Sequence, residues 1–325
     1  MPQAIVIRNY GDADALQLED VSVPSPAQDE LRIRQTAIGV NFHDVYVRSG
    51  LYKTLPLPGT PGCEATGVVE QIGEDVRGFS VGDRVAYVTA SYGAYASERT
   101  LPAHLALKLD NNISDNLAAS SLLRAMTVEM LMCQVRLIKP GMTILVHAAA
   151  GGMGRLLCQW ATHQGATVIG TVGSAEKADS ARQAGCQHTV LYRETNVVEA
   201  VNEITQGTGV DVVYDSVGAD TFESSIASLA KCGHLVNFGQ SSGPVQPLLM
   251  SDLAAKSLTV SRPILFHYLD EPSRYHAMAK TALDAFAQGV LRADALPQQF
   301  ELKDAAKAHK TLESRMGGGS MVLKP

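Results

Sequence analysis

A glycine-rich turn in the middle of the chain constrains the fold more than any other segment. Residues 144–146 form a short apolar run, His147 and three alanines follow, and then come Gly151, Gly152 and Gly154 before a helix-like stretch that runs to His163. This order predicts a buried strand, a tight turn and the start of a helix. The backbone N–H groups of such a helix start attract anions, as does its dipole. The turn therefore predicts a site for the pyrophosphate of a dinucleotide.

The glycines fall at the spacing that dinucleotide sites use, with one exception. Ala149 stands where the first glycine of the fingerprint is usual, and Gly151 and Gly154 occupy the other two positions. The second glycine lets the backbone approach the pyrophosphate, and the third lets the helix pack on the strand. We therefore expect Gly151, Gly152, Met153 and Gly154 to bind the cofactor.

Length, charge and cysteine content exclude several classes of protein. A chain of 325 residues predicts two domains, and 46% hydrophobic with 18% charged residues is typical of a globular protein. The net charge of -6 argues against a dedicated nucleic-acid-binding protein. We expect neither a secretion signal nor a membrane span, because no apolar run is long enough. Five scattered cysteines without a Cys-x-x-Cys pair predict free thiols in a reducing cytoplasm.

The pattern of short strands changes along the chain. Strand-like runs at 4–7, 30–34, 67–73 and 83–88 predict a small, mainly β domain. In the middle, strands and helices alternate, which predicts a doubly wound parallel sheet. The strands are expected at 143–147, 167–172, 189–191, 210–215 and 234–238, with helices at 155–164, 175–185 and 197–206. Two amphipathic helices, 275–289 and 303–315, and a strand at 320–323 are expected to complete the β domain, so the nucleotide domain is an insertion.

The end of the second strand of the predicted parallel sheet indicates which cofactor is used. A carboxylate there would bond the ribose hydroxyls of NAD, but this strand ends in Val172-Gly173-Ser174 with no acid. Ser174 and Lys177 offer a hydroxyl and an ammonium for a 2′-phosphate, and Tyr192 could close over it. Lys177 could instead be an ordinary solvated lysine, and Glu176 beside it counts against phosphate binding. The missing acid favours NADPH.

Seven motifs together resemble a known family. They are residues 39–44 (GVNFHD), 48–52 (RSGLY), 61–67 (PGCEATG), 81–85 (VGDRV), 147–154, 212–218 (VVYDSVG) and 312–315 (LESR). The chain resembles the zinc-independent medium-chain dehydrogenases/reductases of the quinone oxidoreductase (zeta-crystallin-like) group, near its bacterial NADPH:quinone reductases. The resemblance implies a GroES-like catalytic domain (1–124 and 264–325), a Rossmann NADPH-binding domain (125–263) and an active site between them. It also implies a homodimer formed through edge strands near 258–260.

The positions that bind catalytic zinc in related enzymes carry other residues here. Asn41 stands where those relatives have a cysteine, Cys63 stands at their histidine, and the junction 122–125 offers no thiolate. A catalytic zinc needs about three nitrogen or sulfur ligands, and neither Cys63 nor His43 has a clear third partner. We therefore expect no metal, with Cys63 as a buried residue and His43 as a polar residue of a loop or pocket.

Without a Lewis acid, an alcohol is a poor substrate, and a quinone or conjugated enone suits the site better. Hydrogen bonds can stabilise the delocalised oxyanion that such acceptors form. The expected donors are the Asn41 amide, the Tyr46 and Tyr52 phenols and the Arg124 guanidinium. The tyrosines could instead only pack the wall of the site, and Arg124 could be a salt-bridge partner.

The resemblance also implies cofactor contacts for residues at the ends of several elements. They are Asn41, Tyr46, Thr127, Gly173, Ser174, Lys177, Tyr192, Ser216, Val217, Phe238, Gly239, Gln240, Ser241 and Arg315. The chain departs from close relatives at two positions, because they often carry a lysine at Arg124 and a tyrosine at Met130. His147, at the strand end before the turn, is expected to support that loop and not to transfer protons.

Two other functions remain open from the sequence. Asn41-x-x-Asp44 with Gly50-Leu51-Tyr52 also resembles mitochondrial-type enoyl thioester reductases, which implies an enoyl or alkenal double-bond reductase with Tyr52 as the proton donor. A non-enzymatic NADPH-binding protein, crystallin-like or RNA-binding, is the other alternative. The acidic charge balance argues against RNA.

Overall fold

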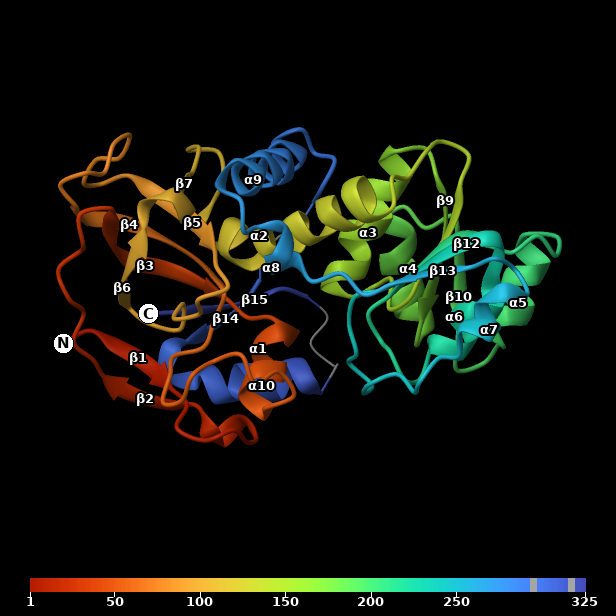
Figure 1. Ribbon diagram of the computed structural model, residues 1–325, viewed down its shortest axis with the longest axis horizontal. Coiled ribbons are helices and arrows are strands. Elements are labelled where there is room, and N and C mark those ends of the chain that lie inside the picture. Colours follow the sequence, from red (N-terminus) through yellow and green to blue (C-terminus); the bar gives the residue numbers. More distant parts are fainter. Residues whose placement is uncertain (293–296, 315–318) are drawn as a thin grey trace. The chain divides into compact units, whose positions relative to one another are not determined.

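The computed structural model describes residues 1–292, 297–314 and 319–325, and the chain divides into two compact units (Figure 1). The first unit comprises Met1–Leu123, Leu269–Ala287 and Ala293–Pro325, and the second comprises Arg124–Tyr268 and Gln288–Arg292. Residues 264–268 and 288–292 thus group with the second unit by their contacts. The assignment of 1–124 with 264–325 to a catalytic domain and of 125–263 to a cofactor domain stays a prediction.

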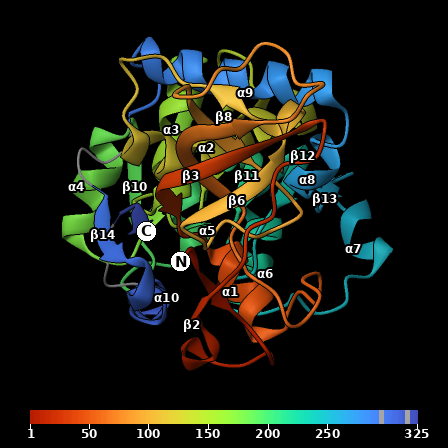
Figure 2. The ribbon, with the colours of Figure 1, turned by 90° about the vertical axis from the view of Figure 1, so that its left-hand side faces the viewer.

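The first unit is built on a mixed sheet of seven strands (Figure 2). Its order is β14-β15-β3-β4-β5-β7, and β6 pairs with β3. All pairs are antiparallel except the parallel pair β14 and β15. The strands are β3 (Glu30–Gly39), β4 (Glu64–Ile72), β5 (Arg84–Val88), β6 (Glu98–Pro102), β7 (Leu107–Lys108), β14 (Gln298–Glu301) and β15 (Met321–Lys324), with a separate pair β1 (Gln3–Val6) and β2 (Gln17–Asp20).

Helices from both ends of the chain belong to this unit. They are α1 (Phe42–Ser49), α9 (Pro272–Ala287) and α10 (Ala305–Glu313), with short 3-10 turns η1 (Ala13–Ala15), η2 (Ala103–Leu105) and η4 (Leu302–Asp304). Helix α2 (Asp115–Glu129) carries the chain from this unit into the second. Strand β15 pairs with β3, so the C-terminal strand completes the N-terminal sheet, as the sequence predicted.

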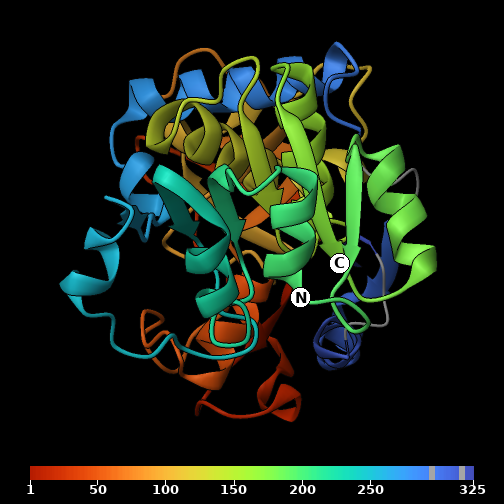
Figure 3. The ribbon, with the colours of Figure 1, turned by 90° about the vertical axis from the view of Figure 1, so that its right-hand side faces the viewer.

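The second unit contains a six-stranded parallel sheet in the order β10-β9-β8-β11-β12-β13 (Figure 3). The strands are β8 (Thr143–Val146), β9 (Thr167–Val172), β10 (His188–Leu191), β11 (Val210–Asp215), β12 (Leu229–Asn237) and β13 (Thr259–Ser261). The direction of winding reverses between β8 and β11, and ligands of such sheets bind at the carboxyl ends of the strands there. This order confirms the expected Rossmann-type α/β fold.

The helices of the second unit follow the strands in alternation. They are α3 (Gly152–His163), α4 (Ala175–Gln183), α5 (Val197–Ile204), α6 (Phe222–Ser228), α7 (Met250–Ala254) and α8 (Leu265–Tyr268), and a π-helical turn η3 (Met130–Val135) follows α2. Among the described residues, none of the helices is long and apolar enough to cross a membrane. Leu145, Ile169, Val213 and Leu235 of the central strands form a fully buried core.

Helices α1, α2 and α6 were not predicted from the sequence, and the predicted start of α3 is too late. Helix α1 was not predicted because its eight residues are too few to show a clear period. Its ends carry recognisable caps, however: Asn41 precedes it, and Gly50 ends it in a left-handed conformation (φ 79°). Helix α3 begins at Gly152, three residues before the predicted start, because the glycines themselves form its first turn.

Candidate cofactor and active site

The glycine turn joins β8 to α3 as the sequence predicted. Ala148 takes a left-handed conformation (φ 53°), the Gly151 N–H donates to the Ala148 carbonyl at 2.9 Å, and α3 begins at Gly152. A Cβ on Gly154 would overlap the Ala148 carbonyl oxygen and lie 2.7 Å from the Ala149 Cα. Glycine at 154 is therefore required for the helix to approach the strand. As at every helix start, the first N–H groups of α3 have no acceptors within the helix.

Arg124 lies against this turn. A Cβ on Gly152 would overlap Nη1 of Arg124, so the guanidinium fills the space that this glycine leaves bare. The Arg124 residue is only 9% exposed. The sequence hypothesis placed this cation beside the quinone, and the structure shows it next to the segment that should hold the pyrophosphate.

The residues expected to bind the adenosine phosphate gather at the ends of β9 and β10. A Cβ on Gly173 would lie 2.9 Å from the Tyr192 hydroxyl, so the phenol reaches across to the preceding strand. The Ser174 hydroxyl caps α4 by accepting the Lys177 N–H at 3.4 Å, which places Lys177 in the first turn of that helix. Tyr192 is 49% exposed and Lys177 is exposed, so both are accessible to a ligand.

The loops after β11 and β12 are joined to each other. The Phe238 N–H donates to the Asp215 carbonyl at 2.8 Å, and the Ser241 N–H donates to the Ser216 carbonyl at 3.2 Å. A Cβ on Gly239 would lie 2.6 Å from that same Ser216 oxygen, so glycine permits the close approach. The remaining expected contacts, Val217 and Gln240, lie in the same two loops.

Sequence reasoning missed Asp215, which builds these loops. Its Oδ1 accepts the N–H groups of Val217 at 2.7 Å and Gly218 at 3.1 Å. The Ser225 hydroxyl lies 3.3 Å from its Oδ2 and 3.0 Å from His147 Nε2, and His147 Nδ1 lies 3.0 Å from the Thr171 hydroxyl. Burial lowers the pKa of His147, so the neutral ring links the ends of β8, β9 and β11 as a support.

Asn41, the central residue of the expected catalytic set, caps α1 in the first unit. It is 7% exposed, and its Nδ2 donates to Glu64 Oε1 at 2.7 Å. Its backbone N–H donates to Asp44 Oδ2 at 2.8 Å. Glu64, itself 1% exposed, also accepts the Leu123 N–H at 2.7 Å. Glu64 thus holds the side-chain amide of Asn41, and Asp44 holds its backbone N–H.

Tyr46 and Tyr52 form an aromatic cluster with two residues that the catalytic set did not include. Their ring centroids are 5.1 Å apart in an edge-to-face arrangement, and the His43 ring lies 5.7 Å from Tyr52 and is stacked 5.9 Å from Tyr92. His43 Nε2 lies 3.2 Å from the Tyr92 hydroxyl, which also bonds Thr54. Burial lowers the pKa of His43 to about 4, so its ring is neutral near pH 7.

The residues at the zinc positions of related enzymes do not fit a zinc ion. Cys63 is fully buried, and burial, followed by the charges of Asp44 and Glu64, raises the pKa of its thiol well above the usual range. Zinc binds the thiolate, which this surrounding disfavours. Asn41 supplies an amide that is already bonded to Glu64. Within the described part of the chain, no three His, Cys, Asp or Glu side chains are grouped to hold a metal.

Three further positions complete the set from the sequence. Thr127 lies in the last turns of α2, half-buried, and Met130, which begins the π-helical turn, is buried at 1% exposure. Arg315 lies outside the described residues.

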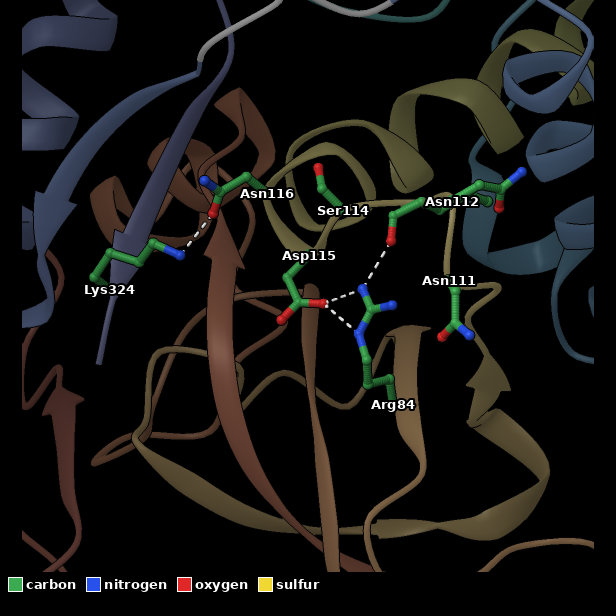
Figure 4. A pocket seen from close by; sticks show the side chains of 8 residues that line it. Arg84, Asn111, Asn112, Ser114, Asp115, Asn116 and Lys324 are labelled. Carbon is green, nitrogen blue, oxygen red and sulfur yellow. Dashed lines mark hydrogen bonds and ion pairs between the residues drawn. The ribbon is translucent and has the colours of Figure 1, made fainter.

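A polar hollow lies on the first unit (Figure 4). It is lined by Arg84, Asn111, Asn112, Ile113, Ser114, Asp115, Asn116 and Lys324. Arg84 forms an ion pair with Asp115 at 2.5 Å, and Lys324 donates to Asn116 at 2.6 Å. Its charged groups are therefore engaged with each other or with neighbouring amides, and it contains none of the expected site residues.

The parallel sheet of the second unit, with a glycine turn at its switch point, and the mainly antiparallel sheet of the first unit are typical of a medium-chain dehydrogenase/reductase. Two family models match the chain: the alcohol dehydrogenase GroES-like domain over residues 27–111 and the zinc-binding dehydrogenase domain over residues 152–284.

Relatives of similar length narrow the class. The chain is 42% identical to a 2-haloacrylate reductase of a Burkholderia species, over 100% of this chain and 99% of that protein. It is 43% identical to a quinone oxidoreductase of Pseudomonas aeruginosa over the whole of both chains. The crystal structure of Escherichia coli quinone oxidoreductase complexed with NADPH matches with a TM-score of 0.95 at 42% identity, covering 99% of this chain and 100% of that one. The chain belongs to the quinone oxidoreductase family of medium-chain dehydrogenases/reductases.

The two outer glycines of the turn should respond differently to alanine. Gly154→Ala forces a Cβ into the β8–α3 backbone, and such overpacking costs about 1–3 kcal/mol of unfolding free energy. Gly151→Ala finds its nearest atom, the Ala148 oxygen, at 3.2 Å, so stability should change little while NADPH affinity falls. Urea unfolding and NADPH fluorescence titration of both variants measure this, and equal losses of stability would contradict the assignment.

Proposed function

We propose that the protein is an NADPH-dependent quinone oxidoreductase that works without a metal. The observation that carries the proposal is Asn41, held by Glu64 at a position where related enzymes have a zinc ligand, in a chain whose relatives at 42–43% identity include quinone oxidoreductases. Hydrogen-bond donors without a Lewis acid suit an acceptor whose reduced form is a delocalised oxyanion.

NADPH, when bound, supplies the hydride. Gly151, Gly152 and Met153 would hold its pyrophosphate at the start of α3, with Arg124 as an adjacent cation. The rest of the dinucleotide would bind along the loops after β11 and β12, at Ser216, Val217, Phe238, Gly239, Gln240 and Ser241. Its nicotinamide end would contact Thr127, Asn41 and Tyr46. Arg315 is proposed at the phosphate end.

The side chains of the first unit act on the acceptor. The Asn41 amide and the Tyr46 and Tyr52 phenols donate hydrogen bonds to the oxygen on which negative charge develops. The fixed orientation of Asn41 matters because a preorganised donor does not have to reorient during the reaction. The His43 ring packs on Tyr52, and because it is neutral it places no positive charge beside the phenol.

NADPH is preferred over NADH because Ser174, Lys177 and Tyr192 meet where an NAD site would carry a carboxylate. Lys177→Ala should raise the KM for NADPH by about tenfold, the size of one exposed charge-assisted contact, and leave the KM for NADH nearly unchanged. Arg182→Ala is the matched control, because Arg182 lies on the same helix and pairs with Asp179 at 2.7 Å. Equal effects on both cofactors would show that Lys177 is only a surface charge.

A double-bond reductase is the second candidate, favoured by the relative named 2-haloacrylate reductase at 42% identity. In that reaction Tyr52 would protonate the carbon next to the one that receives hydride. The Tyr52 phenol contacts the rings of Tyr46 and His43, which would orient it. A non-enzymatic role would require tight NADPH binding with no turnover of any acceptor.

One panel separates these functions. Wild-type protein and Tyr52→Phe are given NADPH with benzoquinones, alkenals, haloacrylates and enoyl thioesters, before and after dialysis against EDTA. We expect quinone turnover that survives EDTA and falls only a few-fold in Tyr52→Phe. Alkene turnover abolished by Tyr52→Phe would favour the second candidate, and activity lost with EDTA and restored by zinc would refute the metal-free site.

We also propose a homodimer that extends the parallel sheet through β13. This strand is the edge of the six-stranded sheet, and edge strands offer unpaired backbone groups to a partner. Val260→Pro places a proline in the middle of this edge strand and should shift the protein from dimer to monomer in sedimentation equilibrium. The control is Val197→Pro, because Val197 is the first residue of α5, a position that tolerates proline. Val322→Pro is unsuitable as a control, because β15 is an inner strand of its sheet. A monomeric wild-type protein would refute the proposal.

The cytoplasm is the proposed location. The five cysteines are free thiols, and Cys232 is exposed, as suits a reducing compartment. Cell fractionation tests this, and recovery in an oxidising compartment would overturn it.

A further inference from the structure

A chain of buried hydrogen bonds connects the C-terminal helix α10 to the start of α1. Glu313 on α10 accepts two bonds from the Arg48 guanidinium, both at 2.9 Å. Arg48 Nη1 lies 3.3 Å from His309 Nδ1, and His309 Nε2 lies 3.0 Å from the Tyr95 hydroxyl. That hydroxyl lies 3.2 Å from Asp44 Oδ2. The sequence motifs at 48–52 and 312–315 contribute Arg48 and Glu313 to these bonds.

Arg48 determines which group donates and which accepts in each of these hydrogen bonds. A guanidinium only donates, so His309 Nδ1 must accept. His309 Nε2 then carries the ring hydrogen and donates to the Tyr95 oxygen, which leaves the Tyr95 O–H to donate to Asp44. Burial and the nearby Arg48 charge lower the pKa of His309 to about 3, so the ring is neutral, as this pattern requires. The tautomer is assigned by the partners and not by chance.

Asp44 is the end point of the chain and the start of the candidate active site. Its Oδ2 accepts both the Tyr95 O–H and the Asn41 backbone N–H at 2.8 Å. Burial is the main cause that raises the pKa of Asp44, which is about 7, and the negative charge of Glu64 raises it further. The hydrogen bonds from the Asn41 backbone, from Tyr95 and from Cys63 lower this pKa. A protonated Asp44 is a weaker acceptor for two donors, so the capping bond at Asn41 depends on this carboxylate being ionised.

We propose that Arg48, His309 and Tyr95 form a positioning relay that keeps Asp44 as the acceptor for Asn41 and so holds the start of α1 in the orientation used for reduction. None of the three touches the proposed substrate. The inference rests on the proposed function only in that Asn41 and Tyr46, carried by the start of α1, face the reacting groups. Fixing the position of Asn41 through this series of hydrogen bonds matters because a small displacement of a hydrogen-bond donor in an active site reduces the rate.

The Tyr95→Phe variant removes one hydroxyl and nothing else. Because the Tyr95 bond lowers the pKa of Asp44, its loss raises that pKa, and the acid limb of the kcat profile should move to higher pH by about one unit. Near pH 7, kcat should fall several-fold while the NADPH Kd, from fluorescence titration, stays within twofold. A merely structural tyrosine would change stability without moving the limb.

The matched control is Tyr87→Phe. Tyr87 is equally buried, but its hydroxyl donates to Gln35 at 2.5 Å and not to Asp44. The pH profile of this variant should overlay that of the wild type. Equal shifts in both variants, or none in Tyr95→Phe, would overturn the relay.

A second pair guards against misfolding of Tyr95→Phe. In His309→Gln, the amide can accept from Arg48 and donate to Tyr95, so the wild-type profile should return. His309→Leu can do neither, and its acid limb should move in the same direction as in Tyr95→Phe. Identical profiles for the glutamine and leucine variants would count against the relay.

A measurement without substrate separates this inference from the proposed function. Difference infrared spectroscopy of the carboxyl stretch, with Asp44→Asn to identify the band, gives the Asp44 pKa in the resting protein. The relay predicts a higher value in Tyr95→Phe than in wild type. If no quinone is turned over but this shift is present, the proposed function fails and the relay stands. If turnover is present and the shift is absent, the relay fails.

Discussion

The close approach of α3 to β8 is the constraint on which the second unit depends. It exists because residue 154 has no side chain, and any Cβ there meets the backbone of residues 148 and 149. The approach aims the first amides of α3 at the carboxyl edge of the sheet, where the loops after β9, β11 and β12 also end. Asp215 and His147 then bond those loops to one another. One missing side chain thus determines where a nucleotide can bind, and a buried polar network keeps that place in shape.

In the first unit, the main constraint is the burial of acidic side chains. Two buried carboxylates, Glu64 and Asp44, are costly in a protein interior unless donors satisfy them. Asn41 satisfies one with its amide and the other with its backbone, so the same bonds that offset the burial also orient the side chain. The position of Asn41 is therefore fixed by hydrogen bonds to these two acids.

Much of this could be read from local patterns, and the failures share one cause. Three signals could be read from a few neighbouring residues each. They are the spacing of the glycines, the missing acid after β9 and the residues at the zinc positions of related enzymes. Arg124 could not be placed, because its contact with Gly152 joins residues 28 positions apart through the packing of α2 and α3 within one unit. Tyr92 stands outside the seven motifs, and Asp215 stands inside the motif at 212–218, but the importance of both lies in the distant atoms that they reach.

The sequence by itself determined the class of fold, the strand–turn–helix at the glycines and NADPH as the cofactor, because backbone sterics and charge act over a few residues. Only the tertiary structure showed that Arg48 meets Glu313, that Tyr95 reaches Asp44 and that Asn41 is held between two acids. Those partners lie up to 265 residues apart. Which buried donor finds which acceptor depends on how the strands and helices pack, and no local pattern of side chains encodes that choice.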